Sequence, residues 1–547
     1  MRSLEGKKGP KVNRSMTDPI TTFAERTFLG ALPIAFRAAS CGFMASLVLG
    51  IPFTSIAAAE IPDSAVKSAE ESITDDELKD HAAYLSNDSF EGREAGTRGG
   101  QAAGGYIVQE LSALDLKPAG DGGYYQSWGN QYRNILALWE GSDPQLKREL
   151  IVVGAHYDHV GYGTATNSFG PLGYIHNGAD DNASGTAALL ELAEACAEME
   201  DRPKRSVLFA WWDAEEKGLL GSKHWLANRT LREYRVVFDL NMDMVGRMKD
   251  KRLEVSGVRT APGLREFIAR NMDDIDANIA YDWEIREDSD HWPFFNARVP
   301  FIMLHTGLHE NYHRPSDDSG LLNIEGMRET THLALRLIVD AADRPQAFAY
   351  RAASRREGES HERNERVAPD PPPSRLGIRW NAASEANGLV LSQVVVGSAA
   401  HQAGLVIGDR LTAFNGEKID DGDVFRAWIM ASEPNVQLNY LRNGTEQVAN
   451  LQLGGYPVRL GISWKEDDAE PGCVKLSQVV ENSPAAAAGL ALADRVLSVG
   501  GERFANTTEF RELLERSGET ITLEMERAGT IWTADLKMPN VPALADQ

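Results

Sequence analysis

The run "ELIVVGAHYD", residues 149–158, decides the fold, because its apolar centre predicts a buried strand that ends at His156 and Asp158. Similar apolar runs lie within residues 206–216, 235–246 and 299–307, and the amphipathic stretch "SGTAALLELAEACAEM" occupies 184–199. Strands that alternate with helices predict an α/β fold, with a mostly parallel sheet covered by helices on both faces. In such sheets ligands bind at the carboxyl ends of the strands.

The length and charge of the chain limit what it does. Its 547 residues exceed what one compact core usually holds, so we expect two to four domains. The formal net charge of -24 leaves no basic stripe for a phosphate backbone, and no nucleic-acid partner is expected.

The first 60 residues differ in composition from the rest. Basic residues as far as Arg37 precede "CGFMASLVLGIPFTSIAAAE", residues 41–60. A charged segment, a short apolar segment and small residues predict a secretory signal peptide over 1–59, cut near Ala59. We therefore expect a secreted or periplasmic protein with no membrane span after cleavage. The alternative is an uncleaved N-terminal anchor, although the apolar stretch is shorter than the ~20 residues that a span needs.

The C-terminal part of the chain repeats itself. A first domain over 60–350 is followed by a charged, proline-rich linker over 351–373, and then by units over 374–455 and 456–540. Both units begin with an "RLGI" motif and resemble PDZ domains, which are small and β-rich. The resemblance implies that each groove binds a peptide C-terminus as an added strand, or that the units regulate access to the first domain. The implied carboxylate-binding loops are Leu376, Gly377 and Ile378, and Leu460, Gly461 and Ile462.

Polar side chains follow the predicted strands where each strand ends. His156 and Asp158 follow the first run, Glu215 and Glu216 the second, and Asp243 the third. Asp180 and Asp181 precede the predicted helix, and the last run leads to His305, His309, Tyr312 and His313. Imidazoles and carboxylates without cysteine suit Zn²⁺, and a carboxylate is able to bridge two ions. Five ligands, one of them bridging, would hold a pair of zinc ions.

In this order, the motifs resemble those of the di-zinc exopeptidases of metallopeptidase family 28, which includes many bacterial aminopeptidases. The matching elements are H-x-D at 156–158, D-N-x-S-G at 181–185, E-E-x-G-x-x-G-S at 215–222, D-M at 243–244 and Y-H at 312–313. The resemblance implies a zinc-exopeptidase fold of the phosphorylase/hydrolase-like type. It makes 60–350 a zinc-dependent peptidase domain.

The resemblance also implies two zinc ions per chain. The implied ligands are His156 and Asp243 for one ion, Glu216 and His313 for the other, and Asp181 as the bridge. A cis peptide bond is expected after the bridging aspartate, between Asp181 and Asn182.

The same resemblance assigns roles around the metal ions. Glu215 would be the general base, Asp158 would lie behind His156, and Tyr312 would add a hydrogen bond to the oxyanion. Asp290 and His291 match a stretch near the substrate pocket, where a lining role and a structural role are both open. The other imidazoles are not at ligand positions and are expected in the pocket or on the surface; they are His159, His176, His305 and His309.

Together these features predict an exported zinc metallo-exopeptidase, an aminopeptidase that hydrolyses peptide bonds at the N-terminus of peptides. A dipeptidase or a carboxypeptidase on the same site is the main alternative, because the sequence does not identify the residues that decide which chain end is read. Glutaminyl cyclases resemble the family but use a single zinc, whereas this chain has ligands for two. A non-catalytic peptide-binding protein is disfavoured, because none of the six expected residues is missing.

Overall fold

A computed structural model describes residues 61–129, 131–370, 374–381 and 388–544. The predicted signal peptide over 1–59 lies outside the described residues, as does the proline run at 371–373. Among the described residues, none of the helices is long and apolar enough to cross a membrane.

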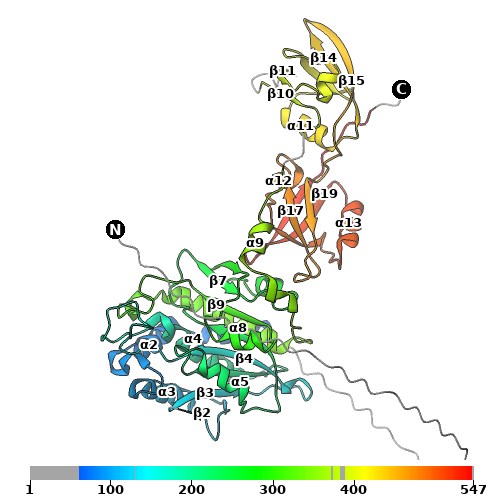
Figure 1. The fold of residues 1–547 in the computed structure, drawn as a ribbon. Helices are drawn as coiled ribbons and strands as arrows, with labels where there is room; N and C mark the ends of the chain where they lie inside the picture. Colours follow the sequence, from blue (N-terminus) through cyan, green and yellow to red (C-terminus); the bar gives the residue numbers. More distant parts are fainter. Residues whose placement is uncertain (1–60, 130, 371–373, 382–387, 545–547) are drawn as a thin grey trace, which may run out of the picture. The chain divides into compact units, whose positions relative to one another are not determined.

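The first domain is built on a nine-stranded mixed sheet, with strand order β1-β3-β5-β4-β6-β9-β7-β8 and β2 paired with β3 (Figure 1). Its centre is parallel, because β4 pairs in parallel with β5 and β6, and β6 with β9. Antiparallel pairs join β3 to β5 and β7 to β9. The strands are β1 (Lys117–Pro118), β2 (Tyr125–Trp128), β3 (Tyr132–Trp139), β4 (Glu149–His156), β5 (Ser206–Trp212), β6 (Arg235–Met242), β7 (Arg252–Ser256), β8 (Asn278–Asp282) and β9 (Phe301–His305).

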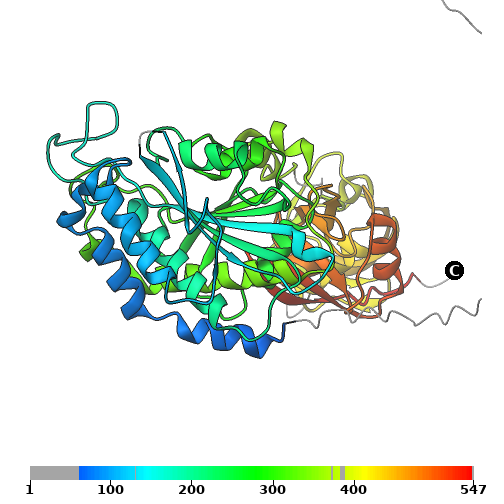
Figure 2. The ribbon, with the colours of Figure 1, turned by 90° about the horizontal axis from the view of Figure 1, so that it is seen from below.

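Helices cover both faces of this sheet (Figure 2). Alternate residues of β4 explain why: Ile151 and Val153 pack into the core that includes α4 and α8, whereas Leu150 and Val152 pack on the other face with Trp225 of α5. The predicted α/β fold with a mostly parallel sheet and helices on both faces is confirmed. The helices are α1 (Asp63–Ser72), α2 (Asp75–Leu85), α3 (Arg98–Leu111), α4 (Gly185–Glu198), α5 (Leu220–Ala227), α6 (Leu264–Arg270), α7 (His291–Asn296) and α8 (Ile324–Asp343).

Two β-rich units follow, each with its own apolar core. Their sheets have equivalent orders, β10-β11-β12-β14-β15 and β16-β17-β18-β19-β20, so the sequence repeat is also a structural repeat. The first contains β10 (Ile378–Trp380), β11 (Leu389–Val394), α10 (Ala399–Gln402), β12 (Arg410–Phe414), β13 (Glu417–Lys418), α11 (Gly422–Ala431), β14 (Asn435–Arg442) and β15 (Thr445–Gln452). The second contains β16 (Ile462–Lys465), β17 (Val474–Val479), α12 (Pro484–Ala487), β18 (Arg495–Val499), α13 (Thr507–Arg516), β19 (Thr520–Arg527) and β20 (Thr530–Lys537).

The segment predicted as a charged, proline-rich linker over 351–373 contains regular structure in its described part. A 3-10 turn covers Ala352–Arg356, and α9 covers Glu359–Glu365. Arg351 is buried and its guanidinium donates to both carboxylate oxygens of Glu357, at 2.6 Å each. Part of the charge in this linker is therefore paired and buried.

Candidate metal centre and active site

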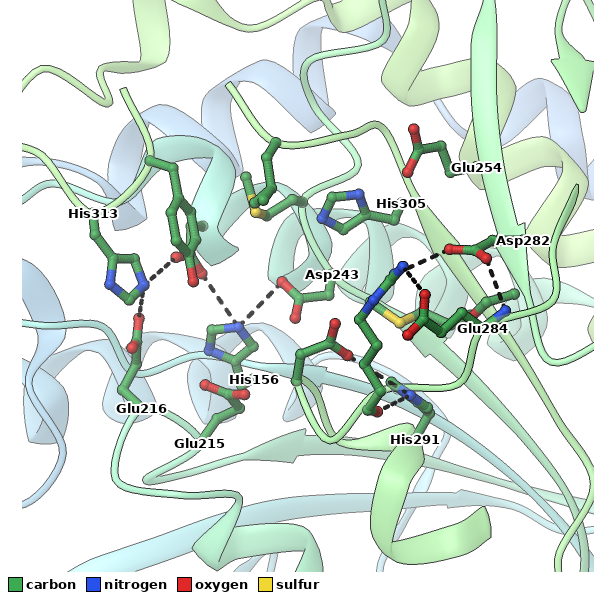
Figure 3. A pocket seen from close by; sticks show the side chains of 18 residues that line it. His156, Glu215, Glu216, Asp243, Glu254, Asp282, Glu284, His291, His305 and His313 are labelled. Atoms are coloured by element: carbon green, nitrogen blue, oxygen red, sulfur yellow. Dashed lines mark hydrogen bonds and ion pairs between the residues drawn. The ribbon is translucent and has the colours of Figure 1, made fainter. Parts of the chain in front are cut away.

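The functional side chains gather at one edge of the sheet because the central strands are parallel. β4 ends at His156, Glu215 and Glu216 follow β5, and Asp243 follows β6. The strands are neighbours, so these side chains meet in one place (Figure 3). The segment η3 (Ala179–Ser184) brings in Asp181 from the turn before α4.

The first group of possible metal ligands is His156, Asp181 and Asp243, all of them buried. The Nε2 atom of His156 lies 3.4 Å from Oδ1 of Asp181 and 3.3 Å from Oδ1 of Asp243. The three possible ligand atoms therefore lie close together. They belong to the two residues expected to bind one ion and to the aspartate expected to bridge.

A second group contains His159, Asp181, Glu216 and His313. The Nε2 atom of His313 lies 3.0 Å from Oδ2 of Asp181 and 3.2 Å from Oε1 of Glu216. The Nδ1 atom of His159 lies 2.9 Å from the same Glu216 oxygen and 3.7 Å from Oδ2 of Asp181. Asp181 thus belongs to both groups, with a different carboxylate oxygen in each, and the peptide bond to Asn182 is cis as expected.

The donor atoms fit divalent metal ions of the zinc type. Tetrahedral zinc with bonds of about 2.0–2.1 Å places its ligand atoms about 3.3 Å apart, close to most separations in the two groups. Oδ2 of Asp181, Oε1 of Glu216 and Nδ1 of His159 are buried, and their near polar neighbours among the described residues are other ligand atoms of the same group. Buried carboxylates gathered in this way are costly, and metal ligation is a common reason for them.

The electrostatics of the centre favour a cation. Burial lowers the pKa of His313, but hydrogen bonds and charge from Asp181 and Glu216 outweigh it and bring the pKa to about 10. The pKa of His156 is likewise well above its ordinary value in spite of burial, because Asp243 and Glu215 lie nearby. Charges that hold a proton this strongly also attract a divalent ion, which binds in competition with that proton.

Adjacent glutamates have different surroundings. The Glu216 carboxylate lies in the second ligand group, whereas Glu215 lies outside both groups and lines the cavity beside them. Ala214 adopts a left-handed φ of 58°, so the chain turns sharply as it leaves β5. Burial raises the pKa of Glu215 well above its ordinary value, and Glu216 and Asp243 add to this effect. A carboxylate with a raised pKa is suited to accepting and returning a proton.

Asp158 contacts both His156 and Glu215. The Nδ1 atom of His156 is 3.2 Å from the backbone oxygen of Asp158 and 3.9 Å from its carboxylate, so the backbone is the closer partner. The Asp158 carboxylate accepts a hydrogen bond from the backbone N–H of Glu215 at 3.0 Å. The side chain thus lies behind the imidazole and also fixes the start of the glutamate pair.

Tyr312 and His291 line the cavity, whereas Asp290 does not. The Tyr312 ring stacks on His313 with centroids 4.0 Å apart. The hydroxyl of Ser222 donates to the buried Asp290 carboxylate, so Asp290 ties α5 to the start of α7. Of the two roles left open for Asp290, the structure therefore supports the structural one.

Sequence reasoning missed three residues that hold this site together. His159 is buried in the second ligand group rather than merely lining the pocket, and its place three residues after His156 was the available signal. Ser289 donates to Oδ2 of Asp243 at 2.6 Å. Arg93 is buried and donates to backbone oxygens of four residues, Leu85, Tyr157, Asn177 and Gly178. Ser289 begins the stretch 289–295 that resembles the family near the substrate pocket, but no role was assigned to it, and no motif pointed to Arg93.

The remaining predicted imidazoles lie outside both groups. His305 lines the cavity, and its Nδ1 accepts from the backbone N–H of Gly307. His309 lies 3.2 Å from the Asp180 carboxylate. His176 is buried and hydrogen-bonds the Ser168 hydroxyl at 2.7 Å, so it is neither a pocket residue nor a surface residue.

The predicted carboxylate loops occupy equivalent places in the two C-terminal units. Gly377 and Gly461 have left-handed φ values of 77° and 84°, and a Cβ atom on either would collide with Ser398 or Ser483. Leu376 and Leu460 precede these glycines, and Ile378 and Ile462 begin the strands β10 and β16.

The cavity beside the ligand groups has a volume of about 460 Å³. It is lined by Glu215, Tyr312 and both ligand groups except His159, and also by residues of β7, β8 and the loop after β8. An α/β sheet with a parallel centre, whose strand ends gather imidazoles and carboxylates around such a cavity, is suited to metal-assisted hydrolysis.

Comparison with known proteins identifies the domains. Residues 134–338 match the model of peptidase family M28, and residues 390–438 and 476–527 match a PDZ domain model. The chain therefore contains a peptidase family M28 domain followed by two PDZ domains, as the sequence motifs predicted.

Several relatives are aminopeptidases by name. Leupeptin-inactivating enzyme 1 of Streptomyces exfoliatus is 29% identical over 238 residues, which cover 42% of this chain and 49% of the relative. An aminopeptidase of Pseudomonas aeruginosa is 32% identical over 183 residues, covering 32% and 31% of the two chains. The chain thus spans about half or less of the length of these relatives. The solved LapA aminopeptidase of Legionella pneumophila is 21% identical, with 53% of this chain and 78% of that chain covered and a TM-score of 0.43.

Proposed function

We propose that this protein is an exported, zinc-dependent aminopeptidase. The observation that carries the proposal is the Asp181 carboxylate, which is shared by two ligand groups beside a cavity that Glu215 lines. Two ions held about 3.5 to 4 Å apart are a recurring arrangement for hydrolysing amide bonds.

We assign ligands to both ions from these contacts. His156 and Asp243 would hold one ion, Glu216 and His313 the other, and Asp181 would bridge them. We add His159 to the second ion, because its Nδ1 faces the same Glu216 oxygen as His313 does. Bound zinc would supply a water of lowered pKa and a Lewis acid for the substrate carbonyl.

The chain's own groups would move the proton. Glu215 would take the proton of the attacking water and pass it to the departing amine. Asp158 supports this role, because it holds the backbone N–H of Glu215. Tyr312, which lines the cavity next to His313, would donate a hydrogen bond to the oxyanion.

The charge of the cavity favours the amino end of a peptide over the carboxyl end. A carboxypeptidase needs a free cationic group for the substrate carboxylate. Among the described residues, Arg286 is the one lysine or arginine that lines this cavity, and it already pairs with Asp282 at 3.0 Å and with Glu284 at 2.8 Å.

A comparison of free and blocked substrates tests the proposal. We expect the zinc-loaded protein to release the first residue from peptides with a free amino group, and to leave N-acetylated versions of the same peptides nearly uncut. Mass spectrometry of timed digests shows which end shortens. Loss of C-terminal residues, or equal cleavage of acetylated peptides, would contradict an aminopeptidase.

His159→Ala is expected to weaken the second metal site selectively. The protein should bind two zinc ions with unequal affinity, and the weaker one should be lost to a chelator at least about tenfold more readily than in the wild type. Metal analysis during chelator titration measures this directly. His305→Ala is the matched control, since that imidazole lines the same cavity outside both groups; an equal loss of zinc from both variants would refute the assignment.

Export rests on the composition of residues 1–59, which resembles a secretory signal. We propose that the mature chain begins near Glu60. N-terminal sequencing of the protein recovered outside the cytoplasm checks the cleavage site, and an intact first segment would support the membrane anchor instead.

We propose that the PDZ units bind peptide C-termini or control access to the peptidase domain. The support is that both units place the glycine of their carboxylate loop in the left-handed conformation at the start of a strand. Binding of peptides with free C-termini, compared with the amidated peptides, is the deciding measurement.

A further inference from the structure

The cavity has a second acidic region away from the ligand groups. Glu254 of β7, Asp282 of β8, and Glu284 and Asp288 of the following loop line it. Figure 3 shows Glu254, Asp282 and Glu284 on the side of the pocket away from His313. This region, which we call the acidic wall, belongs to no ligand group found among the described residues.

The acidic wall is only partly neutralised. Arg286 pairs with Asp282 and Glu284, and Arg252, from outside the cavity, lies 2.9 Å from Glu254. Even with both guanidiniums counted, the carboxylates of the wall exceed them by two. Within the described part of the chain, Asp288 contacts no lysine or arginine at ion-pair distance, and its side chain is half exposed. The wall therefore keeps charge for a cationic ligand.

Apolar side chains line the same cavity. Met244, Met303 and Leu308 contribute to its surface. Methionine and leucine adapt to an aliphatic chain, and the stems of lysine and arginine are aliphatic chains that end in a charge. A cavity with both surfaces matches such a side chain better than it matches a purely apolar one.

His291 adds a buried acceptor to the cavity. It is 1% exposed, and its Nε2 lies 3.1 Å from the backbone oxygen of Arg286, to which it must donate. The other nitrogen, Nδ1, is then an unprotonated acceptor, and no described group hydrogen-bonds to it. Burial also lowers the pKa of His291 to about 4, so the ring is neutral at pH 7. A neutral imidazole does not repel a cation.

We propose that this pocket selects substrates whose N-terminal residue is lysine or arginine. The inference rests on the proposed aminopeptidase function. Such a residue carries two positive charges, the α-ammonium and the side-chain cation, and the wall has two carboxylates in excess. An N-terminal residue with a neutral side chain has only its α-ammonium, so it pairs with only one of these two carboxylates.

Amide substrates that differ only in the first side chain test the proposal. Lysine, arginine, norleucine and glutamate p-nitroanilides all carry the α-ammonium, and norleucine has the stem of lysine without its charge. We expect kcat/KM for lysine and arginine to exceed that for norleucine by at least about tenfold, as one charge-assisted hydrogen bond provides, and glutamate to be cleaved least. Added salt should shrink the difference.

A double variant locates the effect. Glu254→Gln with Asp288→Asn keeps the shape of the wall and removes two charges, so the lysine to norleucine ratio should fall about tenfold, mainly through a higher KM for lysine. Zinc content and circular dichroism confirm folding. Glu287→Gln is the matched control, because Glu287 pairs with Lys223 and does not line the cavity.

The possible results distinguish a failure of the selection for basic residues from a failure of the proposed aminopeptidase activity. If no free N-terminal amide is cleaved, including norleucine, the aminopeptidase proposal fails. If norleucine is cleaved as well as lysine, or if the double variant keeps the wild-type ratio, the aminopeptidase stands and the selection of basic residues is refuted.

Discussion

Glu215→Gln is expected to lower kcat by about a thousandfold while both zinc ions stay bound, because a positioned general base contributes about 10²–10⁴ in rate. Glu215 lies outside both ligand groups, so its loss removes a proton acceptor and no ligand. The amide keeps the size of the carboxylate and cannot accept the proton of water. Initial rates on an unblocked amide, with metal analysis of the same sample, measure both quantities.

Glu216→Gln is the control for that experiment. Its carboxylate lies 3.2 Å from Nε2 of His313 and 2.9 Å from Nδ1 of His159, so the change weakens a ligand. We expect zinc content to fall towards one ion per chain, and added zinc to restore part of the activity. If Glu215→Gln also loses zinc, or keeps wild-type turnover, the base has been assigned to the wrong glutamate.

Asp181→Ala is expected to remove both zinc ions and, with them, all measurable turnover. Its two oxygens face different groups, with Oδ1 at 3.4 Å from His156 and Oδ2 at 3.0 Å from His313. A single substitution therefore removes one ligand from each of the two ions. Metal analysis after gel filtration and a zinc titration measure the result.

Asp243→Asn is the control for Asp181→Ala, because Asp243 would bind one ion whereas Asp181 would bind both. Asp243 contacts His156 and belongs to the first group alone, so this variant should lose one zinc and keep the other. Equal stoichiometry in Asp181→Ala and Asp243→Asn would show that Asp181 does not bridge.

The order of the motifs was enough to predict which strand ends meet. Apolar runs mark buried strands, and the carboxyl ends of neighbouring parallel strands must lie together, so His156 and the pair Glu215 and Glu216 could be placed in one region. The choice of Glu216 as the ligand came from the family resemblance. The cis bond at Asp181 was expected from family resemblance, and no local pattern would have indicated it.

What sequence could not reveal depends on distant contacts. His159 shares its run with His156, yet only the folded loop shows that its ring turns toward Glu216. Asp290 was placed near the pocket by family resemblance, with a structural role left open, and its carboxylate accepts a hydrogen bond from Ser222, 68 residues away. The acidic wall is drawn from β7, β8 and the loop after β8, so no short motif contains it.

Arg93 has a consequence for how the centre comes into being. Its guanidinium joins the segments around Leu85, Tyr157 and Gly178, and the carboxylates of Asp181, Asp158 and Glu216 act on its charge from nearby. Even with its pKa lowered to about 10 by burial, it stays protonated at neutral pH. Arg93 therefore places a permanent positive charge close to the acidic side chains of the centre. The backbone oxygens that Arg93 binds belong to segments beside the ligand groups, so it supports their arrangement through hydrogen bonds that involve no metal ligand.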